Sequence, residues 1–362
     1  MRILIVCPRL CHGGAERVAV SLANGFAEKG HEVTVLANLY DEVTYHLGSK
    51  VTCRNLVSTN RHKILKWGSA IKRIRKYVKQ VHPDIVIGIM ALCSLISRIA
   101  TIGLKVPVIA TEHDAFERPE SASMPFGIRF GKFYLNRIYK CVTVLTESDR
   151  KIIGSRLHNV VVMPNPLAIP RATKIPYKEK TILAAGRVDN WHYKGFDVLI
   201  RAWGQIAGKY PDWTLQIAGV YKSVNTRLFL DGIAREHHVE NRVKYLGFVE
   251  DMTSLYKKSA VFVLSSRYEG FGLVLVEAMS QGCACIACDY HGRQREIITS
   301  EREGLVCAPD NVTDLAAAME RVISDDVYRQ KVMTGGMDRA AYYSIPHIIE
   351  RWELLINQLI NN

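Results

Sequence analysis

Two glutamates, Glu269 and Glu277, stand eight positions apart in the second half of the chain. The residues that follow the first of them are Gly270, Phe271, Gly272 and Leu273. A helix that begins near Gly272 would offer free backbone N–H groups to an anion, with Glu269 in the preceding loop and Glu277 about one turn inside. Two carboxylates beside an anion site suit the hydroxyl groups at both ends of a sugar nucleotide, ribose and hexose. The alternative is a surface acid and a capping acid.

Two cations precede this segment. Arg187 follows Gly186 at the end of an apolar run, and Lys194 precedes Gly195 and the next helical pattern. Open α/β sheets bind ligands at the carboxyl edge of their strands, and an arginine fork and a lysine suit the two phosphates of a nucleotide diphosphate. Taken alone, these residues would be better explained as two solvated surface cations.

A glycine pair, Gly13 and Gly14, lies between the first apolar run and the first helical pattern. Glycines allow close backbone approach to a ligand, and the following helix N-terminus favours an anion. The spacing is not that of the dinucleotide fingerprint, and a purely structural turn is the alternative.

Short β-branched runs alternate with segments of helical period, which predicts an α/β fold with parallel sheets. At 362 residues the chain exceeds one core, and the prolines around Pro164 and Pro166 mark a linker. We expect Rossmann-like domains over residues 1–166 and 167–344, and a C-terminal amphipathic helix over 345–362 that packs on the first domain or within the second. The expected strands are residues 2–7, 32–37, 51–57, 84–89, 107–111, 141–145, 160–163, 181–185, 214–218, 243–246, 260–264 and 283–288.

The chain resembles the family 4 retaining glycosyltransferases of the GT-B fold over nearly its whole length. It is most similar to bacterial enzymes that extend lipid-linked oligosaccharides or polysaccharide repeat units. The resemblance is carried by Gly13-Gly14-Ala15-Glu16-Arg17, Thr111-Glu112-His113, Gly186-Arg187, Lys194-Gly195, the segment from Glu269 to Glu277, and Gly304-Leu305-Val306 with Pro309.

The resemblance implies two doubly wound domains that face a central cleft, and a role for each matching residue. Gly13 and Gly14 would approach the donor diphosphate, Arg187 and Lys194 would neutralise it, and the backbone from Gly270 to Leu273 would help to hold it. Glu277 would bind the ribose, Glu269 the transferred sugar, and His113 would lie beside the reacting carbon, unless it only ends a strand.

This sequence departs from the family pattern at two places. The stretch between Arg187 and Lys194 is about two residues longer than usual, which weakens the assignment of Lys194. His291-Gly292 stands where many relatives have two glycines before Glu296, so the backbone of that loop is open to question.

No D-x-D motif is present to hold a metal on the diphosphate, so we expect metal-independent transfer without a cofactor, with a UDP-sugar as the donor substrate. Negative charge grows on the leaving diphosphate while the anomeric bond breaks, and preorganised cations stabilise it. Cys285 and Cys288 have a zinc-like spacing, but no second ligand pair lies at a suitable distance, so a buried strand is the better interpretation.

The net charge of +13 falls in the first half, where residues 1–166 hold 24 Lys and Arg against 12 Asp and Glu. A basic amphipathic helix over 61–79 would lie on anionic lipid or grip an acceptor pyrophosphate, or else cover its own domain. A second segment, residues 125–140, also suits a lipid-linked acceptor, because it interleaves Phe126, Phe130, Phe133 and Tyr134 with Arg129, Lys132, Arg137 and Lys140.

With no signal peptide or membrane-spanning run in the sequence, we expect a cytoplasmic protein, peripheral at the inner face of the membrane. The expected acceptor is a polyprenyl-diphosphate-linked or other saccharide, and the expected partner an anionic membrane surface. Nucleic acid is not expected, because the aromatic and motif arrangement of known binding modules is missing. A sugar-nucleotide epimerase or hydrolase and a non-catalytic nucleotide-sugar-binding protein remain alternatives.

Overall fold

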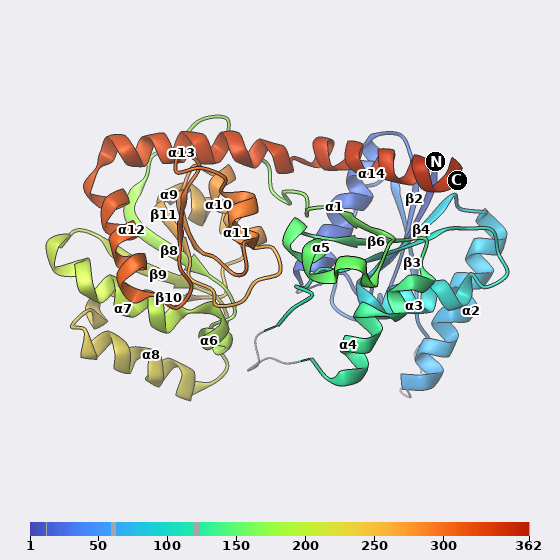
Figure 1. Ribbon diagram of the computed structural model, residues 1–362, viewed down its shortest axis with the longest axis horizontal. Coiled ribbons are helices and arrows are strands. Elements are labelled where there is room, and N and C mark those ends of the chain that lie inside the picture. The colour runs from blue at the N-terminus through green and yellow to red at the C-terminus, as the bar shows by residue number, and fades with distance from the viewer. Residues whose placement is uncertain (12, 59–62, 119–123, 362) are drawn as a thin grey trace. The chain divides into compact units, whose positions relative to one another are not determined.

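The computed structural model describes residues 1–11, 13–58, 63–118 and 124–361. The chain forms two compact units, one made of Met1–Ala168 with Ile345–Asn362 and the other of Ile169–Ser344 (Figure 1). Among the described residues, no helix combines the length and the apolar character needed to cross a bilayer.

Seven strands form the sheet of the first unit: β1 Arg2–Val6, β2 Glu32–Ala37, β3 Val51–Asn55, β4 Ile85–Ile89, β5 Val108–Thr111, β6 Cys141–Val144 and β7 Val160–Val162. All neighbours are parallel, in the order β3-β2-β1-β4-β5-β6-β7. The central strands are almost uninterrupted apolar runs, as expected for strands covered on both faces. The order reverses between β1 and β4, which is the switch point where doubly wound sheets bind ligands.

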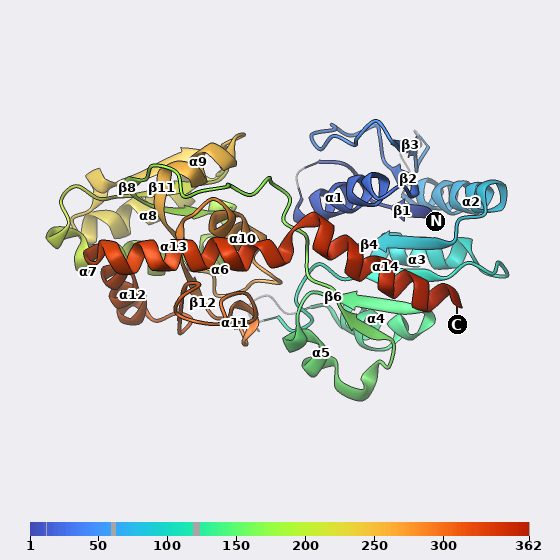
Figure 2. The same cartoon turned by 90° about the horizontal axis from the view of Figure 1, so that it is seen from above.

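The helices of this unit are α1 Gly14–Glu28, α2 Lys63–Val81, α3 Met90–Ala100, α4 Phe126–Phe133, α5 Glu147–Ile153 and α14 Ile345–Asn361, with a 3-10 turn η2 Leu135–Ile138. Parallel crossovers are right-handed, so α1, which leads from β1 to β2, lies on the face opposite α2 and α3, whose connections run the other way along the sheet. Figures 1 and 2 show α14 on the same face as α1.

The last helix is integral to the first unit. A Cβ atom on Gly25 of α1 would lie 2.6 Å from Ile345 Cγ2, so the two helices approach closely there. Trp352 is 3 % exposed, and its ring meets Phe26 edge to face at 6.5 Å. Polar links add to this packing: Lys29 with Glu350, His31 with Glu353, and Arg351 with the carbonyl of Val162.

The second unit has a six-stranded parallel sheet in the order β10-β9-β8-β11-β12-β13, so that its order reverses between β8 and β11. Its strands are β8 Glu179–Ala185, β9 Thr214–Ala218, β10 Val243–Gly247, β11 Ser259–Leu264, β12 Ala284–Cys288 and β13 Leu305–Cys307. Every strand expected from the sequence is present with bounds shifted by at most two residues. β13 was not expected, because three residues are too few to display a period.

The helical elements of the second unit that matter below are η4 Val188–Asn190, α6 Trp191–Lys194, α7 Phe196–Ile206, α9 Met252–Lys258, α10 Leu273–Ser280 and α11 Arg293–Ile297. The others are η5 Ala207–Lys209, α8 Val224–Glu236, η6 Glu240–Arg242, α12 Val312–Ser324, α13 Asp326–Ala340 and η7 Ala341–Tyr343. Cys285 and Cys288 lie in the buried strand β12, which confirms the strand interpretation of their spacing, and burial raises the pKa of both thiols.

Candidate active site

The first βα turn of the first unit closes around a carboxylate of the chain itself. Gly13 precedes α1 in an extended conformation, and Glu16 in the first helical turn is 3 % exposed. A Cβ atom on Gly13 would lie 1.8 Å from a Glu16 carboxylate oxygen, whereas nothing lies within 4 Å of that position on Gly14. Arg9 Nε donates to Glu16 at 3.1 Å. The positive helix end is thus occupied internally, and the approach of Gly13 and Gly14 to a diphosphate stays a prediction.

His113 follows β5 at the carboxyl edge of the first sheet. Its Nε2 lies 2.9 Å from Thr111 Oγ1, and its Nδ1 lies 3.2 Å from Asn165 Oδ1. The residue as a whole is partly exposed, but burial of the imidazole lowers its pKa to about 4 by desolvation, against a smaller raising effect of Asn165. The imidazole is therefore neutral at pH 7. Asn165 is a positioning residue that sequence reasoning missed, although the prolines on both sides of it restrict its backbone.

Glu112, one residue before His113, forms a buried ion pair. Its carboxylate lies 3.3 Å from Lys132 Nζ and accepts from Asn136 Nδ2 at 3.3 Å. Lys132 also donates to the Ala115 carbonyl at 3.3 Å, which ties α4 to the loop that carries His113. The expectation that Lys132 faces a lipid-linked acceptor is wrong, because its side chain is only 7 % exposed.

In the second unit, Arg187 follows β8 after the single residue Gly186 and is exposed. The longer stretch before Lys194 is taken up by η4 and by the single turn α6, which ends at Gly195. Gly195 has a left-handed φ of 65°, and a Cβ atom there would lie 1.9 Å from the Ser265 carbonyl oxygen. Ser265 Oγ in turn donates to the Lys194 carbonyl at 2.9 Å. Only glycine fits at this crossing, and the crossing sets where Lys194 points.

Lys194 and Glu269 meet at the carboxyl edge of the second sheet. Lys194 Nζ lies 2.5 Å from Glu269 Oε1, and Ser266 Oγ donates to the same oxygen at 2.9 Å. The two side chains are 23 % and 15 % exposed, so the pair is shielded but still reachable by a ligand. A cation expected on the diphosphate and an acid expected on the sugar are therefore in direct contact.

Helix α10 begins at Leu273, immediately after Gly272, whose φ is 93°. Phe271 is 5 % exposed, and its ring meets that of Tyr343 edge to face at 5.6 Å, so its side chain belongs to the packing of this unit. Glu277 lies inside α10 with 1 % exposure and accepts from Tyr256 Oη at 3.3 Å. The ribose role of Glu277 needs a more open carboxylate than this, and it stays a prediction.

Arg267 anchors the loop between β11 and α10. Its guanidinium donates to both carboxylate oxygens of Asp197, at 2.7 and 2.8 Å, and to the His192 carbonyl at 2.7 Å. It also pairs with Asp310 at 2.6 Å. These carboxylates raise the pKa of Arg267, chiefly through the hydrogen bond to Asp197. The sequence offered no signal for this residue, because its partners come from distant parts of the chain.

The loop before α11 has a backbone conformation that glycine favours, although a histidine occupies one of its positions. His291 has a φ of 53° and Gly292 a φ of 82°, so the histidine adopts the left-handed conformation that a glycine would take freely. Gln294 then caps the turn by accepting from the Tyr290 backbone N–H at 2.7 Å.

The two basic segments of the first unit differ in what they expose. In the part of α2 whose side chains the structure describes, Ile74 and Val78 are buried in the core and Trp67 and Ile71 pack against it while partly buried, so this part of the apolar stripe covers its own domain. The turns from α4 to η2 instead expose a set of large apolar side chains: Phe126, Ile128, Phe130, Tyr134, Leu135 and Ile138.

Known proteins resemble the chain along most of its length. The family model "Glycosyltransferase Family 4" matches residues 12–169, and "Glycosyl transferases group 1" matches residues 167–337. The chain is 28 % identical to a Campylobacter jejuni enzyme whose name describes an α-1,4-N-acetyl-D-galactosaminyltransferase acting on a GalNAc-containing saccharide on diNAcBac-PP-undecaprenol, over 100 % of this chain and 99 % of that one. It is 25 % identical to an uncharacterized glycosyltransferase of Haemophilus influenzae, over 94 % and 95 % of the two chains.

Solved structures share the fold. Sucrose-phosphate synthase from Thermosynechococcus elongatus superposes with a TM-score of 0.82 at 20 % identity, over 99 % of both chains. An Anabaena protein in complex with UDP and glucose superposes with a TM-score of 0.76 at 19 % identity, over 99 % of this chain and 100 % of that one. With two parallel α/β sheets, a matching family model on each half, and the acidic segment at the end of β11, the chain belongs to the family 4 glycosyltransferases of the GT-B fold.

Proposed function

We propose that the chain transfers a hexose or N-acetylhexosamine from a UDP-sugar to a lipid-linked saccharide, with retention of anomeric configuration. The observation that carries this proposal is the contact of 2.5 Å between Lys194 and Glu269 beside the first turn of α10. A cation for phosphate, an acid for sugar hydroxyls and a helix N-terminus are thereby gathered within one loop region.

The donor diphosphate would be held by Arg187, Lys194 and the backbone from Gly270 to Leu273. Preorganised donors aimed at a developing charge are each worth about 3–4 kcal/mol. Lys194 has to exchange Glu269 for phosphate as the donor enters, and the freed carboxylate then accepts from the sugar hydroxyl groups. The UDP choice is supported by the Anabaena structure, which holds that nucleotide. Cations and the helix end take the part that Mg²⁺ plays elsewhere, so transfer is metal-independent.

Retention is proposed to occur by attack on the face from which the diphosphate leaves. The acceptor oxygen bonds to the anomeric carbon, the bond from that carbon to the diphosphate oxygen breaks, and the acceptor proton passes to the departing phosphate. Glu269 is a poor nucleophile for a double displacement, because its Oε1 accepts from Ser266 Oγ at 2.9 Å and, once Lys194 has turned to the phosphate, the carboxylate would accept from the sugar hydroxyl groups. That engagement supports a path without a covalent glycosyl intermediate.

The acceptor is proposed to be a polyprenyl-diphosphate-linked saccharide at the inner membrane face. The name of the Campylobacter relative contains such a lipid carrier. In this chain, Phe126 is 83 % exposed, and the rings of Phe126, Phe130 and Tyr134 stack in succession at 6.3 and 5.3 Å. Arg129 and Arg137 are exposed in the same segment. Aromatic and basic side chains together suit the interface between hydrocarbon and headgroups.

A nucleotide-release assay tests the proposal. UDP-, GDP- and ADP-sugars are incubated with and without polyprenyl-diphosphate-linked saccharide, with chelator present, and the product anomer is assigned by NMR. We expect acceptor-dependent UDP release and an α product from an α donor. Release that is equal without acceptor would indicate a hydrolase or epimerase, and a trapped adduct on Glu269 would replace the same-face path.

A matched pair of variants locates the site. Glu269→Gln should lower turnover at least a hundredfold, because it removes the charge that balances Lys194 and grips the sugar. Glu320→Gln breaks a Lys–Glu contact of the same unit, with Lys209 at 2.8 Å, and should leave turnover within about twofold. Equal losses in the two variants would contradict the placement.

A further inference from the structure

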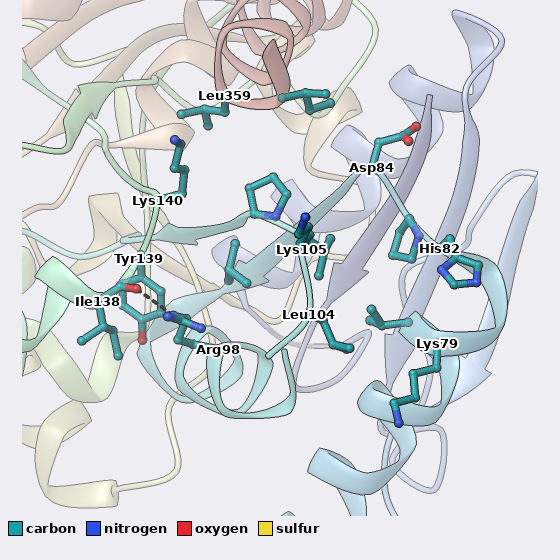
Figure 3. Close-up of a pocket in the computed structure, with 16 residues that line it drawn as sticks. Lys79, His82, Asp84, Arg98, Leu104, Lys105, Ile138, Tyr139, Lys140 and Leu359 are labelled. Atoms are coloured by element: carbon teal, nitrogen blue, oxygen red, sulfur yellow. Dashed lines mark hydrogen bonds between the residues drawn. The ribbon is translucent and has the colours of Figure 1, made fainter. Parts of the chain in front are cut away.

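A cavity of about 930 Å³ opens at the amino edge of the sheet in the first unit (Figure 3). Asp84, Pro107 and Lys140, which immediately precede β4, β5 and β6, line it. The ends of α2 and α14 contribute further wall residues, among them Lys79 and Leu359. Because all strands are parallel, this edge is opposite the one where the loops after β1 and β5 lie. Within the first unit, the cavity therefore lies at the other edge of the sheet from Gly13, Gly14 and His113.

The charge of this cavity is one-sided. Its lining carries Lys79, Arg98, Lys105 and Lys140 against the single carboxylate of Asp84. Asp84 already accepts from the Arg2 backbone N–H at 2.7 Å. Within the described residues, none of the three lysines forms an ion pair, and all three are exposed. These exposed ammonium groups are therefore available to pair with an anion from outside the chain.

Arg98 is held at the cavity by its own hydrogen bond. Its Nε donates to the Ile138 carbonyl at 2.8 Å, drawn as the dashed line in Figure 3. This contact uses Nε–H and orients the guanidinium, and no other hydrogen bond of Arg98 is seen among the described residues. A fixed guanidinium fork is suited to phosphate oxygens, and surrounding lysines add point charges.

The same cavity is also apolar. Val78, Leu104, Val106, Ile138, Leu359 and Ile360 line it. Beside it, α3 and the turn that follows expose one stripe of large apolar side chains at helical spacing: Leu92 at 43 %, Leu95 at 40 %, Ile99 at 40 % and Ile102 at 59 %. The opposite side of α3 buries Cys93, Ile96 and Ala100 in the core. A helix that covers a sheet needs one apolar face, and α3 has two.

We propose that this cavity binds the phosphate of an anionic phospholipid, with the exposed stripe of α3 against the acyl region of the same bilayer leaflet. The lysines and Arg98 supply positive charge for the phosphate. The adjoining apolar stripe favours a lipid over a free phosphate ester, because only the lipid has hydrocarbon that the stripe can bury. This inference goes beyond the proposed transfer reaction. It requires no UDP-sugar and no acceptor, and it concerns the opposite edge of the sheet.

The test measures the binding of the full-length protein to vesicles. Co-sedimentation is followed with phosphatidylcholine vesicles that contain 30 % or no phosphatidylglycerol, at low and at 0.5 M salt, and free glycerol 3-phosphate is titrated separately. The variant Lys105→Glu/Lys140→Glu is compared with Lys50→Glu/Lys151→Glu, which changes the net charge equally at exposed positions of the same unit outside the cavity. Lys105→Arg/Lys140→Arg keeps the charge.

We expect anionic vesicles to bind the wild type and the arginine variant, and the cavity glutamate variant to bind roughly tenfold or more weakly, since each basic group near such a surface contributes substantially. The matched control variant, Lys50→Glu/Lys151→Glu, should lose clearly less of its affinity for anionic vesicles. The proposal is overturned if the cavity glutamate variant binds anionic vesicles as tightly as the control variant does. It is also overturned if free glycerol 3-phosphate saturates the protein at the same concentrations at which it displaces the vesicles, because the site would then bind a phosphate ester without any lipid. Nucleotide release with a water-soluble acceptor reports separately on the transfer reaction, so failure of either proposal is recognised by itself.

Discussion

At the scale of single residues, the second unit places the exposed residue Arg187 in the loop that follows β8. If it neutralises the leaving diphosphate, Arg187→Ala should lower kcat at least a hundredfold, which corresponds to about 3 kcal/mol of transition-state stabilisation. Steady-state kinetics with a saturating UDP-sugar measure this. Arg201→Ala removes an arginine of α7 that lies 3.5 Å from Glu236, and it should change kcat less than twofold. A loss below fivefold for Arg187→Ala would remove this residue from the site.

His113 gives a prediction on pH dependence. Burial lowers its pKa to about 4, below the ordinary 6.5, so protons bind the unfolded chain more tightly than the folded one. The contribution of the neutral His113 ring to the free energy of unfolding is fully present above pH 6.5. It is lost as the pH falls from 6.5 through 4, and the total loss is about 3 kcal/mol. An NMR titration should show a neutral His113 ring at pH 5.5, and His113→Gln should flatten the pH dependence of unfolding in that window. A midpoint near 6.5 would contradict the burial.

At the scale of elements, the crossing of α6 under the loop after β11 depends on one glycine. Gly195→Ala would force a left-handed φ on alanine and bring its Cβ atom to 1.9 Å from the Ser265 carbonyl oxygen. We expect the free energy of unfolding to fall by about 2 kcal/mol or more, and turnover to fall with it, because Lys194 moves away from Glu269.

Gly208→Ala is the control for that change. Gly208 lies in η5 of the same unit, with nothing within 4 Å of its Cβ position. Urea unfolding and UDP release should both remain close to wild type in this variant. If the two alanine variants behave alike, the close crossing does not determine the position of Lys194.

At the scale of the whole molecule, the chain returns to its first unit after completing the second. Trp352 of α14 is 3 % exposed against Phe26 of α1, whereas Leu354 on the same helix is 66 % exposed. Trp352→Ala should therefore cost about 3–5 kcal/mol of stability in the first unit, and Leu354→Ala less than about 0.5 kcal/mol. Urea unfolding followed by circular dichroism compares the two, and similar midpoints would show that α14 contributes little.

The strand positions and the order of the ligand-bearing loops were predictable from local sequence. Buried parallel strands are short apolar runs that repeat between helical segments, so period and composition identify them without any partner. The same holds for α10, which begins at Leu273 beside the glycine that marks its start. β13 was not predicted from the sequence, because it is only three residues long.

The partners of the charged and amphipathic residues were decided by the tertiary structure. Lys194 meets Glu269 across 75 positions, Arg267 meets Asp197 across 70, and Lys132 turns inward to Glu112 instead of facing lipid. An apolar stripe indicates only that a helix packs against some apolar surface and does not identify that surface. The sequence therefore could not predict that α2 covers its own sheet, or that α3 carries a second apolar stripe that stays exposed. Local chemistry thus determined which groups the chain carries and where its strands run. Which of those groups meet depends on contacts between distant segments, and a linear pattern does not contain them.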